Sequence, residues 1–302
     1  MLEKFKINFD GILKLFTGNN IIQSELYNGE HDGMYFCTRR GLKHERKKVN
    51  NEDALLVNSK DNKVHVRIMA VADGVGGIEN GDIASKTLLY KINKWFIKQD
   101  FSEKSKEKLQ EIIHDNIKQI FYEMYEDFSR KYGDNMPATT FSCAIIIDNN
   151  VYIVNVGDSR IYIEDGKSHD ILQLTSDDYG KIGKFDDFFD TSMADNIQIR
   201  RIAKERARYH DENIDNLIDA AVPCAIKDFE VTTYELQEGD TLKLVTDGIT
   251  DTNISQELAG KTAEQLVEAG RNGIYRGGIT PKDDDCTAIT YLYRARGEKD
   301  GK

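Results

Sequence analysis

Hydrophobic residues recur along the chain in two spacings, which predict its secondary structure. Short, nearly continuous apolar runs between polar turns are typical of buried strands. They predict strands at 34–38, 54–57, 65–72, 140–147, 151–156, 161–163, 229–236, 241–246 and 286–293. Tight polar turns separate the runs between 140 and 163, and this pattern predicts an antiparallel meander there.

Three segments instead have apolar residues three and four positions apart, which is typical of one face of a helix. The first spans Ile83–Ile97, and the second carries apolar residues from Leu109 to Phe128. Ser102 suits the N-cap of the second helix, and Gly133 suits its end. A capping box opens the third segment, from Thr262 to about Gly270. Along the chain, the predicted elements follow the order strands, two helices, many strands, a helix and a strand. This order favours an α+β domain in which helices cover antiparallel sheets.

Length and composition favour one large domain with a short extension. The 302 residues are 39% hydrophobic and include only three prolines, and no low-complexity block separates two halves. We expect an N-terminal extension at 1–33, a main domain at 34–296 and a tail at 297–302. Residues 2–16 have an amphipathic pattern that favours packing on the domain over docking to a partner or a membrane. Residues 18–33 are polar and are interpreted as a linker.

The charge of the chain excludes several partners. A formal net charge of -11 argues against nucleic acid or an anionic membrane as the main partner. No run is long and apolar enough to span a bilayer, and acids occur too early for a signal peptide.

The four cysteines are scattered without a C-x-x-C pair, so we expect buried free thiols. A cytoplasmic monomer is the expectation.

Acidic residues stand at the ends of several predicted strands. They are Glu52-Asp53, Asp73-Gly74, Asp247-Gly248 with Asp251, and Asp283-Asp284-Asp285, with Asp158 in a turn between strands. A single strand-end Asp is usually a turn former. Several around one buried sheet would repel one another unless a cation lies between them. Oxygen ligands without His or Cys suit Mg²⁺ or Mn²⁺ and argue against Zn²⁺. Two such ions about 4 Å apart could share a hydroxide that attacks phosphorus.

Five motifs occur along the chain: Asn50–Asp53, Val71–Gly77, Gly157–Arg160, Val245–Asp251 and Asp284–Thr287. In these motifs and their order, the chain resembles the metal-dependent type 2C protein phosphatases. The resemblance covers residues 34–294 and leaves 176–220 unmatched. It implies a four-layer fold, a β-sandwich of two antiparallel sheets flanked by helix pairs. It also implies hydrolysis of phosphoserine and phosphothreonine by a metal-bound hydroxide, without a phosphoenzyme.

The resemblance further implies a role for each matched acid. Asp73 would bridge two Mg²⁺ or Mn²⁺ ions, and the Gly74 carbonyl would bind one of them. Asp247 and Asp284 would hold the other ion. Asp158 matches the residue that helps to hold a third, looser ion in bacterial relatives.

Glu52 and Asp53 would act on the metals directly or through bound waters. Some relatives carry a His after the Asp-Gly pair as a proposed general acid, but this chain has Val75 there. A metal-bound water could then protonate the leaving group. No histidine lies in a motif, so His44 and His210 are expected to be structural or exposed.

The phosphate-binding position departs from the pattern of the family. Its usual Arg, five residues before the position of Asp53, is replaced by Lys48. Lysine can hold a phosphate as a point charge but not as a bidentate fork. If this segment is extended, Arg46, Lys48, Asn50 and Glu52 face one side, so Arg46 is a second candidate. The alternative is that both Arg46 and Lys48 are ordinary solvated charges.

These features predict a Mg²⁺/Mn²⁺-dependent protein serine/threonine phosphatase, acting on phosphoproteins made by a serine/threonine kinase. The charged segment 176–220, with a helix predicted at 198–209, occupies the flap position of the family and is expected to govern substrate choice. Two alternatives stay open: a catalytically weak relative that serves as a binding or scaffold module, which Lys48 favours, and a phosphatase for small phosphate esters. The retained Asp73, Asp247 and Asp284 argue against the scaffold.

Overall fold

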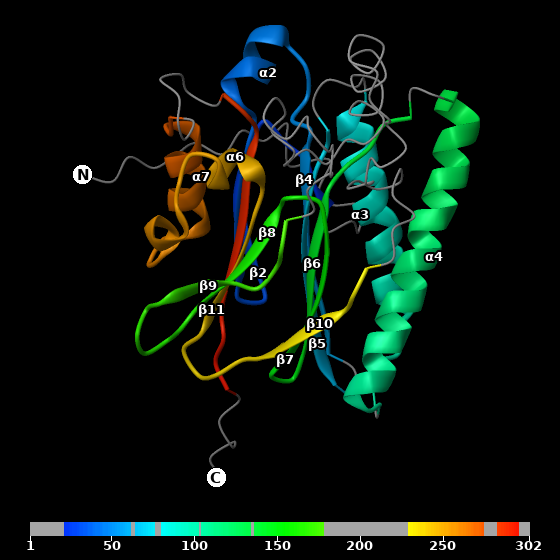
Figure 1. The fold of residues 1–302 in the computed structure, drawn as a ribbon, viewed down its shortest axis with the longest axis vertical. Helices are drawn as coiled ribbons and strands as arrows, with labels where there is room; N and C mark the ends of the chain where they lie inside the picture. Colours follow the sequence, from blue (N-terminus) through cyan, green and yellow to red (C-terminus); the bar gives the residue numbers. More distant parts are fainter. Residues whose placement is uncertain are drawn as a thin grey trace, which may run out of the picture.

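Two six-stranded antiparallel sheets pack face to face, with helices on both outer faces (Figure 1). The computed structural model describes residues 21–61, 64–75, 80–102, 104–133, 136–177, 229–274 and 283–295. The predicted α+β sandwich of four layers is therefore confirmed. Several predicted features lie outside the described residues: the helix at 198–209, nearly all of segment 176–220, the apolar pattern at 2–16 and the tail at 297–302.

The first sheet has the strand order β1-β4-β5-β6-β7-β10. Its strands are β1 (Ile21–Ile22), β4 (Asp53–Asp61), β5 (His65–Asp73), β6 (Phe141–Ile147), β7 (Asn150–Val156) and β10 (Thr232–Glu235). The central strands β4, β5 and β6 are covered on both faces. For that reason their sequences are nearly continuous apolar runs rather than alternating ones.

The second sheet has the strand order β2-β3-β12-β11-β8-β9. Its strands are β2 (Leu26–His31), β3 (Met34–Arg39), β12 (Cys286–Leu292), β11 (Thr241–Val245), β8 (Arg160–Glu164) and β9 (Ile171–Gln173). Strands β7 and β8 are consecutive in the chain but belong to different sheets, so the predicted meander ends at β7. Residues 157–159 carry the chain from one sheet to the other.

Two strands precede residue 34, where the sequence indicated a linker. Strand β1 pairs with β4, and β2 pairs with β3 over six residues. The interpretation of residues 18–33 as a linker is therefore wrong for these strands. The cause is their position at sheet edges: β2 alternates between exposed and half-buried residues, so it carries few apolar side chains.

Helices α3 (Gly81–Lys98) and α4 (Lys106–Tyr132) cover the first sheet. Helix α4 ends at Gly133 as predicted, with a positive φ of 57°. Its N-cap is Ser105, whose Oγ accepts the Lys108 N–H at 3.3 Å. The predicted cap, Ser102, is wrong, because its hydroxyl instead donates to Asp100 at 2.7 Å.

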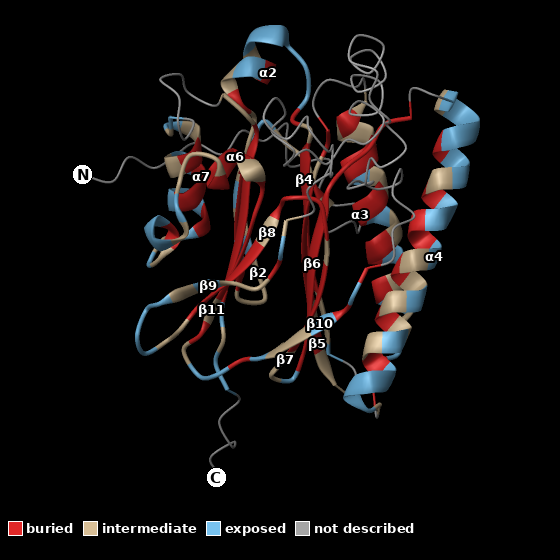
Figure 2. Ribbon diagram, in the orientation of Figure 1, coloured by how far each residue is buried: buried red, intermediate tan, exposed pale blue. Residues whose placement is uncertain are grey.

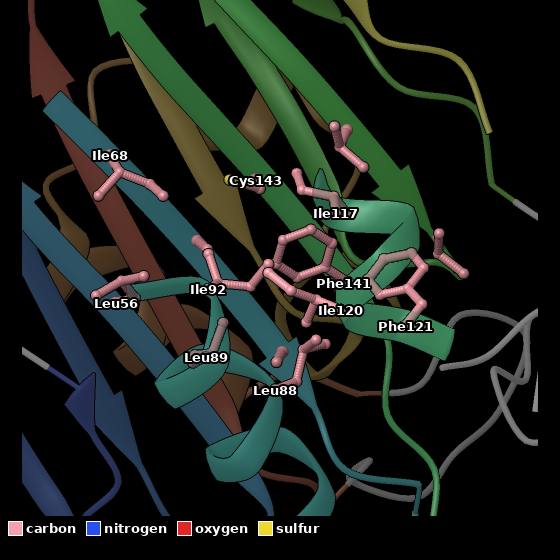
Figure 3. Close-up of a cluster of buried hydrophobic side chains, with 14 of the residues drawn as sticks. Leu56, Ile68, Leu88, Leu89, Ile92, Ile117, Ile120, Phe121, Phe141 and Cys143 are labelled. Atoms are coloured by element: carbon pink, nitrogen blue, oxygen red, sulfur yellow. The ribbon is translucent and has the colours of Figure 1, made fainter. Parts of the chain in front are cut away.

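A large apolar core joins these two helices to the first sheet. Figure 3 shows leucine and isoleucine side chains of both helices meeting the sheet around Phe141. Phe121 of α4 contacts Phe141 edge to face, with ring centroids 5.7 Å apart. A second core fills the space between the sheets, and Figure 2 shows the buried strands of both sheets.

The other face carries α6 (Asp247–Thr250), η3 (Ser255–Leu258) and α7 (Ala263–Arg271) over a third core. The predicted capping box of α7 is confirmed, since Thr262 and Gln265 exchange hydrogen bonds. Cys37, Cys143 and Cys286 are buried free thiols, and Cys224 lies outside the described residues. No helix in the described ranges is long and apolar enough to cross a membrane.

Candidate metal and phosphate site

Ends of strands from both sheets meet below helix α2 (Leu42–Lys47), at the top of the sandwich in Figure 1. Strand β4 begins at Asp53 and β5 ends at Asp73, and the antiparallel register sets these two residues directly opposite each other. Thr246 links the second sheet to them, because its Oγ1 donates to Asp53 Oδ2 at 2.8 Å. Thr246 Oγ1 also accepts the backbone N–H of Thr287 at 3.0 Å. Asp247 and Asp284 therefore lie on segments tied to Asp53.

The electrostatics of Asp73 place the distant acids around it. Burial raises the pKa of Asp73 well above its ordinary value, and the charges of Asp53, Asp247, Asp284 and Asp158 raise it further. These five carboxylates come from residues 53 to 284 and influence one another through space. Asp73 itself keeps some exposed surface.

Asp53 is the most deeply buried member of this group. It is fully buried, and its Oδ1 has no hydrogen-bond partner among the described residues. Burial raises the pKa of Asp53 well above its ordinary value, with a further contribution from the charge of Asp285. A buried oxygen without a partner, surrounded by acids, is the environment that a bound cation would stabilise.

The donor set fits a hard cation, although the present side-chain positions do not enclose one. The matched acids supply only oxygen ligands, which suits Mg²⁺ or Mn²⁺. No group of three or more acidic, His or Cys side chains in the described ranges stands close enough to hold an ion as it is.

Gly74 lies at a point of close backbone approach. A Cβ at this position would lie 2.3 Å from the Gly81 carbonyl oxygen and 2.7 Å from that of Glu52. The Gly74 N–H donates to the Glu52 carbonyl at 3.1 Å. Thr139 Oγ1 donates to the Asp73 carbonyl at 2.8 Å, on the other side. The end of β5 is thus held firmly from two directions, and no larger residue fits at position 74.

Asp285 and His44 also belong to the site; Asp285 was expected only as a member of the acidic cluster at 283–285, and His44 lies in none of the motifs. Asp285 Oδ1 accepts the Gly41 N–H at 2.6 Å. Its Oδ2 accepts the Glu52 N–H at 2.6 Å and lies 2.8 Å from His44 Nδ1. His44 Nε2 lies 3.4 Å from Glu52 Oε2. We expected His44 to be structural or exposed. It is buried, and it also contacts Glu52, a candidate metal ligand.

The pKa values of His44 and Glu52 are both raised, for different reasons. The hydrogen bond to Asp285 raises the pKa of His44, against the opposing effect of its burial. Burial raises the pKa of Glu52 to about 7, and nearby His44 limits this rise.

Lys48 and Arg46 do not lie on an extended segment, so the alternation predicted for them is wrong. Residues 42–47 form helix α2, and Lys48 caps its end with a φ of 58°. The segment Leu-Lys-His-Glu-Arg-Lys consists mostly of good helix formers. The guanidinium of Arg46 pairs with Asp283, and its side chain is 68% exposed. Lys48 is exposed beside the site.

A family model describing protein phosphatase 2C matches residues 40–272 of the chain. The chain belongs to the protein phosphatase 2C family. The resemblance drawn from five acidic motifs is confirmed, and so is the prediction of a metal-dependent protein phosphatase.

Relatives and solved structures agree with this family. The serine/threonine phosphatase stp of Listeria monocytogenes is 28% identical over 259 residues, covering 84% of this chain and 93% of that protein. The crystal structure of the serine/threonine phosphatase Stp1 from Staphylococcus aureus has a TM-score of 0.61 at 22% identity, covering 89% of this chain and 100% of that one. The catalytic domain of the phosphatase PstP, solved with two manganese ions, has a TM-score of 0.57 at 20% identity, covering 86% and 97%.

In this phosphatase, the motif with Asp158 lies where the chain passes between the sheets. Asp158 is 4% exposed. Its neighbour Ser159 is fixed by Thr140, whose hydroxyl lies 2.8 Å from the Ser159 hydroxyl. Arg160 Nε lies 2.8 and 3.0 Å from the two carboxylate oxygens of Asp177. Arg160 thereby holds Asp177 beside β8.

Proposed function

We propose that this type 2C phosphatase hydrolyses phosphoserine and phosphothreonine in proteins, with two Mg²⁺ or Mn²⁺ ions at the acidic group. The supporting observation is that Asp53, Asp158, Asp247 and Asp284 all act on the charge of Asp73 at one strand end. Two divalent ions, when bound, would supply a nucleophile derived from water at neutral pH and neutralise charge on the phosphoryl oxygens.

The chain would contribute the ligands and hold them in place. Asp73 would hold both ions, the Gly74 carbonyl would hold one of them, and Asp247 and Asp284 would hold the other. Asp158 would serve a third, looser ion.

Glu52 and Asp53 would complete the coordination directly or through water. Asp53 supports this assignment with its buried Oδ1, which lacks a hydrogen-bond partner among the described residues. Thr246 holds the other carboxylate oxygen of Asp53, so Oδ1 is the atom left for an ion or its water.

Lys48 is the preferred ligand for the substrate phosphate. It lies at the exposed end of α2, and its ammonium would bind a phosphate oxygen as a point charge. Arg46 is the second candidate. Its pairing with Asp283 competes with a phosphate, which favours Lys48.

The proposed substrates are phosphoproteins made by a serine/threonine kinase. A cytoplasmic location and a monomeric state also stay proposals. The segment 176–220 is proposed to govern the choice among these substrates.

Turnover of p-nitrophenyl phosphate and of a phosphothreonine peptide tests the proposed function. We expect both activities to need Mn²⁺, to stop with EDTA, and to fall by at least about 100-fold in Asp73→Asn. Asp61→Asn, at the opposite end of β4 with an exposed carboxylate, is the matched control and should keep its activity. Activity in EDTA, or unchanged activity of Asp73→Asn, would reject the assignment.

The same assay separates the alternatives. Turnover of the aryl phosphate without turnover of the peptide would favour a small-ester phosphatase. No turnover by the unaltered chain with Mn²⁺ would favour a binding or scaffold module.

A further inference from the structure

Helix α2 contacts the rest of the protein through one buried side chain, in addition to the ion pairs of Arg46 with Asp283 and of Glu45 with Arg271. The helix has six residues, and His44 is the buried one among them, with 5% of its surface exposed. Gly41, which precedes the helix, lies against the backbone of Asp284, since a Cβ there would lie 2.3 Å from the Asp284 carbonyl carbon. The Lys43 N–H donates to the Asp283 carbonyl at 3.1 Å. Helix α2 therefore sits directly on the segment that carries Asp284.

The two ring nitrogens of His44 reach two different carboxylates. Nδ1 lies 2.8 Å from Asp285 Oδ2, and Nε2 lies 3.4 Å from Glu52 Oε2. The same Asp285 oxygen accepts the Glu52 N–H at 2.6 Å. Asp285 thus contacts the backbone of Glu52, and His44 contacts its side chain.

The backbone of His44 also shapes the turn that presents Lys48. The Val49 N–H donates to the His44 carbonyl at 3.1 Å, and the Lys48 N–H donates to the Glu45 carbonyl at 3.2 Å. Lys48 adopts a left-handed conformation at this turn, which the two hydrogen bonds stabilise. The place of Lys48 therefore depends on where His44 holds α2.

We propose that His44 is a positioning residue with two effects: its Nε2 orients Glu52 on the metal side, and its Nδ1 contact with Asp285 fixes the end of α2 that carries Lys48 on the phosphate side. This inference rests on the proposed function of the site. Residues that orient metal ligands typically affect metal affinity or activity about 10- to 100-fold.

Two substitutions can separate these effects. Asparagine places an amide nitrogen near the position of Nδ1, so His44→Asn keeps the contact with Asp285 and loses the one with Glu52. Glutamine places its nitrogen near the position of Nε2, so His44→Gln keeps the contact with Glu52 and loses the one with Asp285. His44→Ala removes both.

The readouts are the Mn²⁺ dissociation constant from calorimetry without substrate, and the inhibition constant of inorganic phosphate at saturating Mn²⁺. We expect His44→Ala to weaken Mn²⁺ binding about 10- to 100-fold and phosphate binding about 3- to 10-fold. His44→Asn should restore phosphate binding only, and His44→Gln should restore Mn²⁺ binding only.

His65→Ala is the matched control. His65 Nε2 makes a similar contact, 2.9 Å from Asp32 Oδ2, at the opposite end of β5 from Asp73. Its loss should leave both constants unchanged.

Three results would overturn the proposal: unchanged constants in His44→Ala, an equal loss in His65→Ala, or His44 variants that lack a folded circular dichroism spectrum. The Mn²⁺ titration does not depend on turnover. An inactive but Mn²⁺-binding chain would therefore reject the proposed function while still testing His44.

Discussion

The carboxyl groups at the strand ends should make the metal-free protein less stable as the pH rises toward neutrality. Burial raises the pKa of Glu52 from 4.5 to about 7, and it raises the pKa of Asp53 and Asp73 well above their ordinary value. A carboxyl group with a higher pKa in the folded chain binds more protons when folded. Its contribution to stability is complete below pH 4.5, the ordinary pKa of Glu52, and is lost as the pH rises through about 7.

The size of this effect follows from the pKa of Glu52. Between about pH 5.5 and about pH 7.5 the folded Glu52 loses most of its proton, whereas an unfolded glutamate is already ionised. The difference amounts to about 2 kcal/mol of unfolding free energy from Glu52 alone. Asp53, Asp73 and His44 act in the same direction, because their pKa values are also raised. A loss of about 2 kcal/mol lowers the melting temperature by roughly 4–8 °C for a domain of this size.

Thermal unfolding in EDTA at about pH 5.5 and about pH 7.5 checks this prediction. The melting temperature should fall with rising pH, and Glu52→Gln should reduce the slope because it removes one titrating group. Asp61→Asn, with an exposed carboxylate, should keep the slope. Mn²⁺ at about 100 times its dissociation constant should add about 2.7 kcal/mol at the higher pH.

A metal-free melting temperature that stays constant or rises with pH would refute this reasoning. So would an equal change of slope in Asp61→Asn and Glu52→Gln.

Three further predictions follow from the fold and the site. Gly74→Ala should destabilise the chain by about 1–3 kcal/mol in urea unfolding, because the added methyl group meets the Gly81 and Glu52 carbonyls; unchanged stability would contradict that close approach. Phe121→Ala should cost about 3–5 kcal/mol in the same assay, since it empties a site against Phe141; a smaller cost would mean that the core collapses into the space. Replacing 176–220 with the corresponding segment of a relative should change the preference among phosphopeptides more than the turnover of p-nitrophenyl phosphate, and equal effects would refute its role in substrate choice.

Much of the fold could be predicted because its central strands are buried on both faces. Strands such as β5 and β6 are continuous apolar runs, and the capping box at Thr262 marks a helix start through local chemistry alone. Strand β2 was missed because an edge strand needs few apolar residues. The passage from β7 to β8 looks like a hairpin turn in the sequence, and only the packing of two sheets separates these strands.

The acids of the site could be predicted because strand ends and Asp-Gly pairs are visible in the sequence. The contact between His44 and Asp285 could not, since it joins residues 241 positions apart and depends on the tertiary fold. Helix α2 could not be predicted from the sequence, for a different reason. Its basic composition indicated a charged segment, and its six residues are too few to show a periodic pattern.

A crystal structure of the unaltered chain soaked in Mn²⁺, with anomalous data at the manganese edge, tests the central claim most directly. We expect two manganese peaks within coordination distance of Asp73, with Asp247 and Asp284 on one of the ions. Manganese bound elsewhere, or no peak within coordination distance of Asp73, would contradict it.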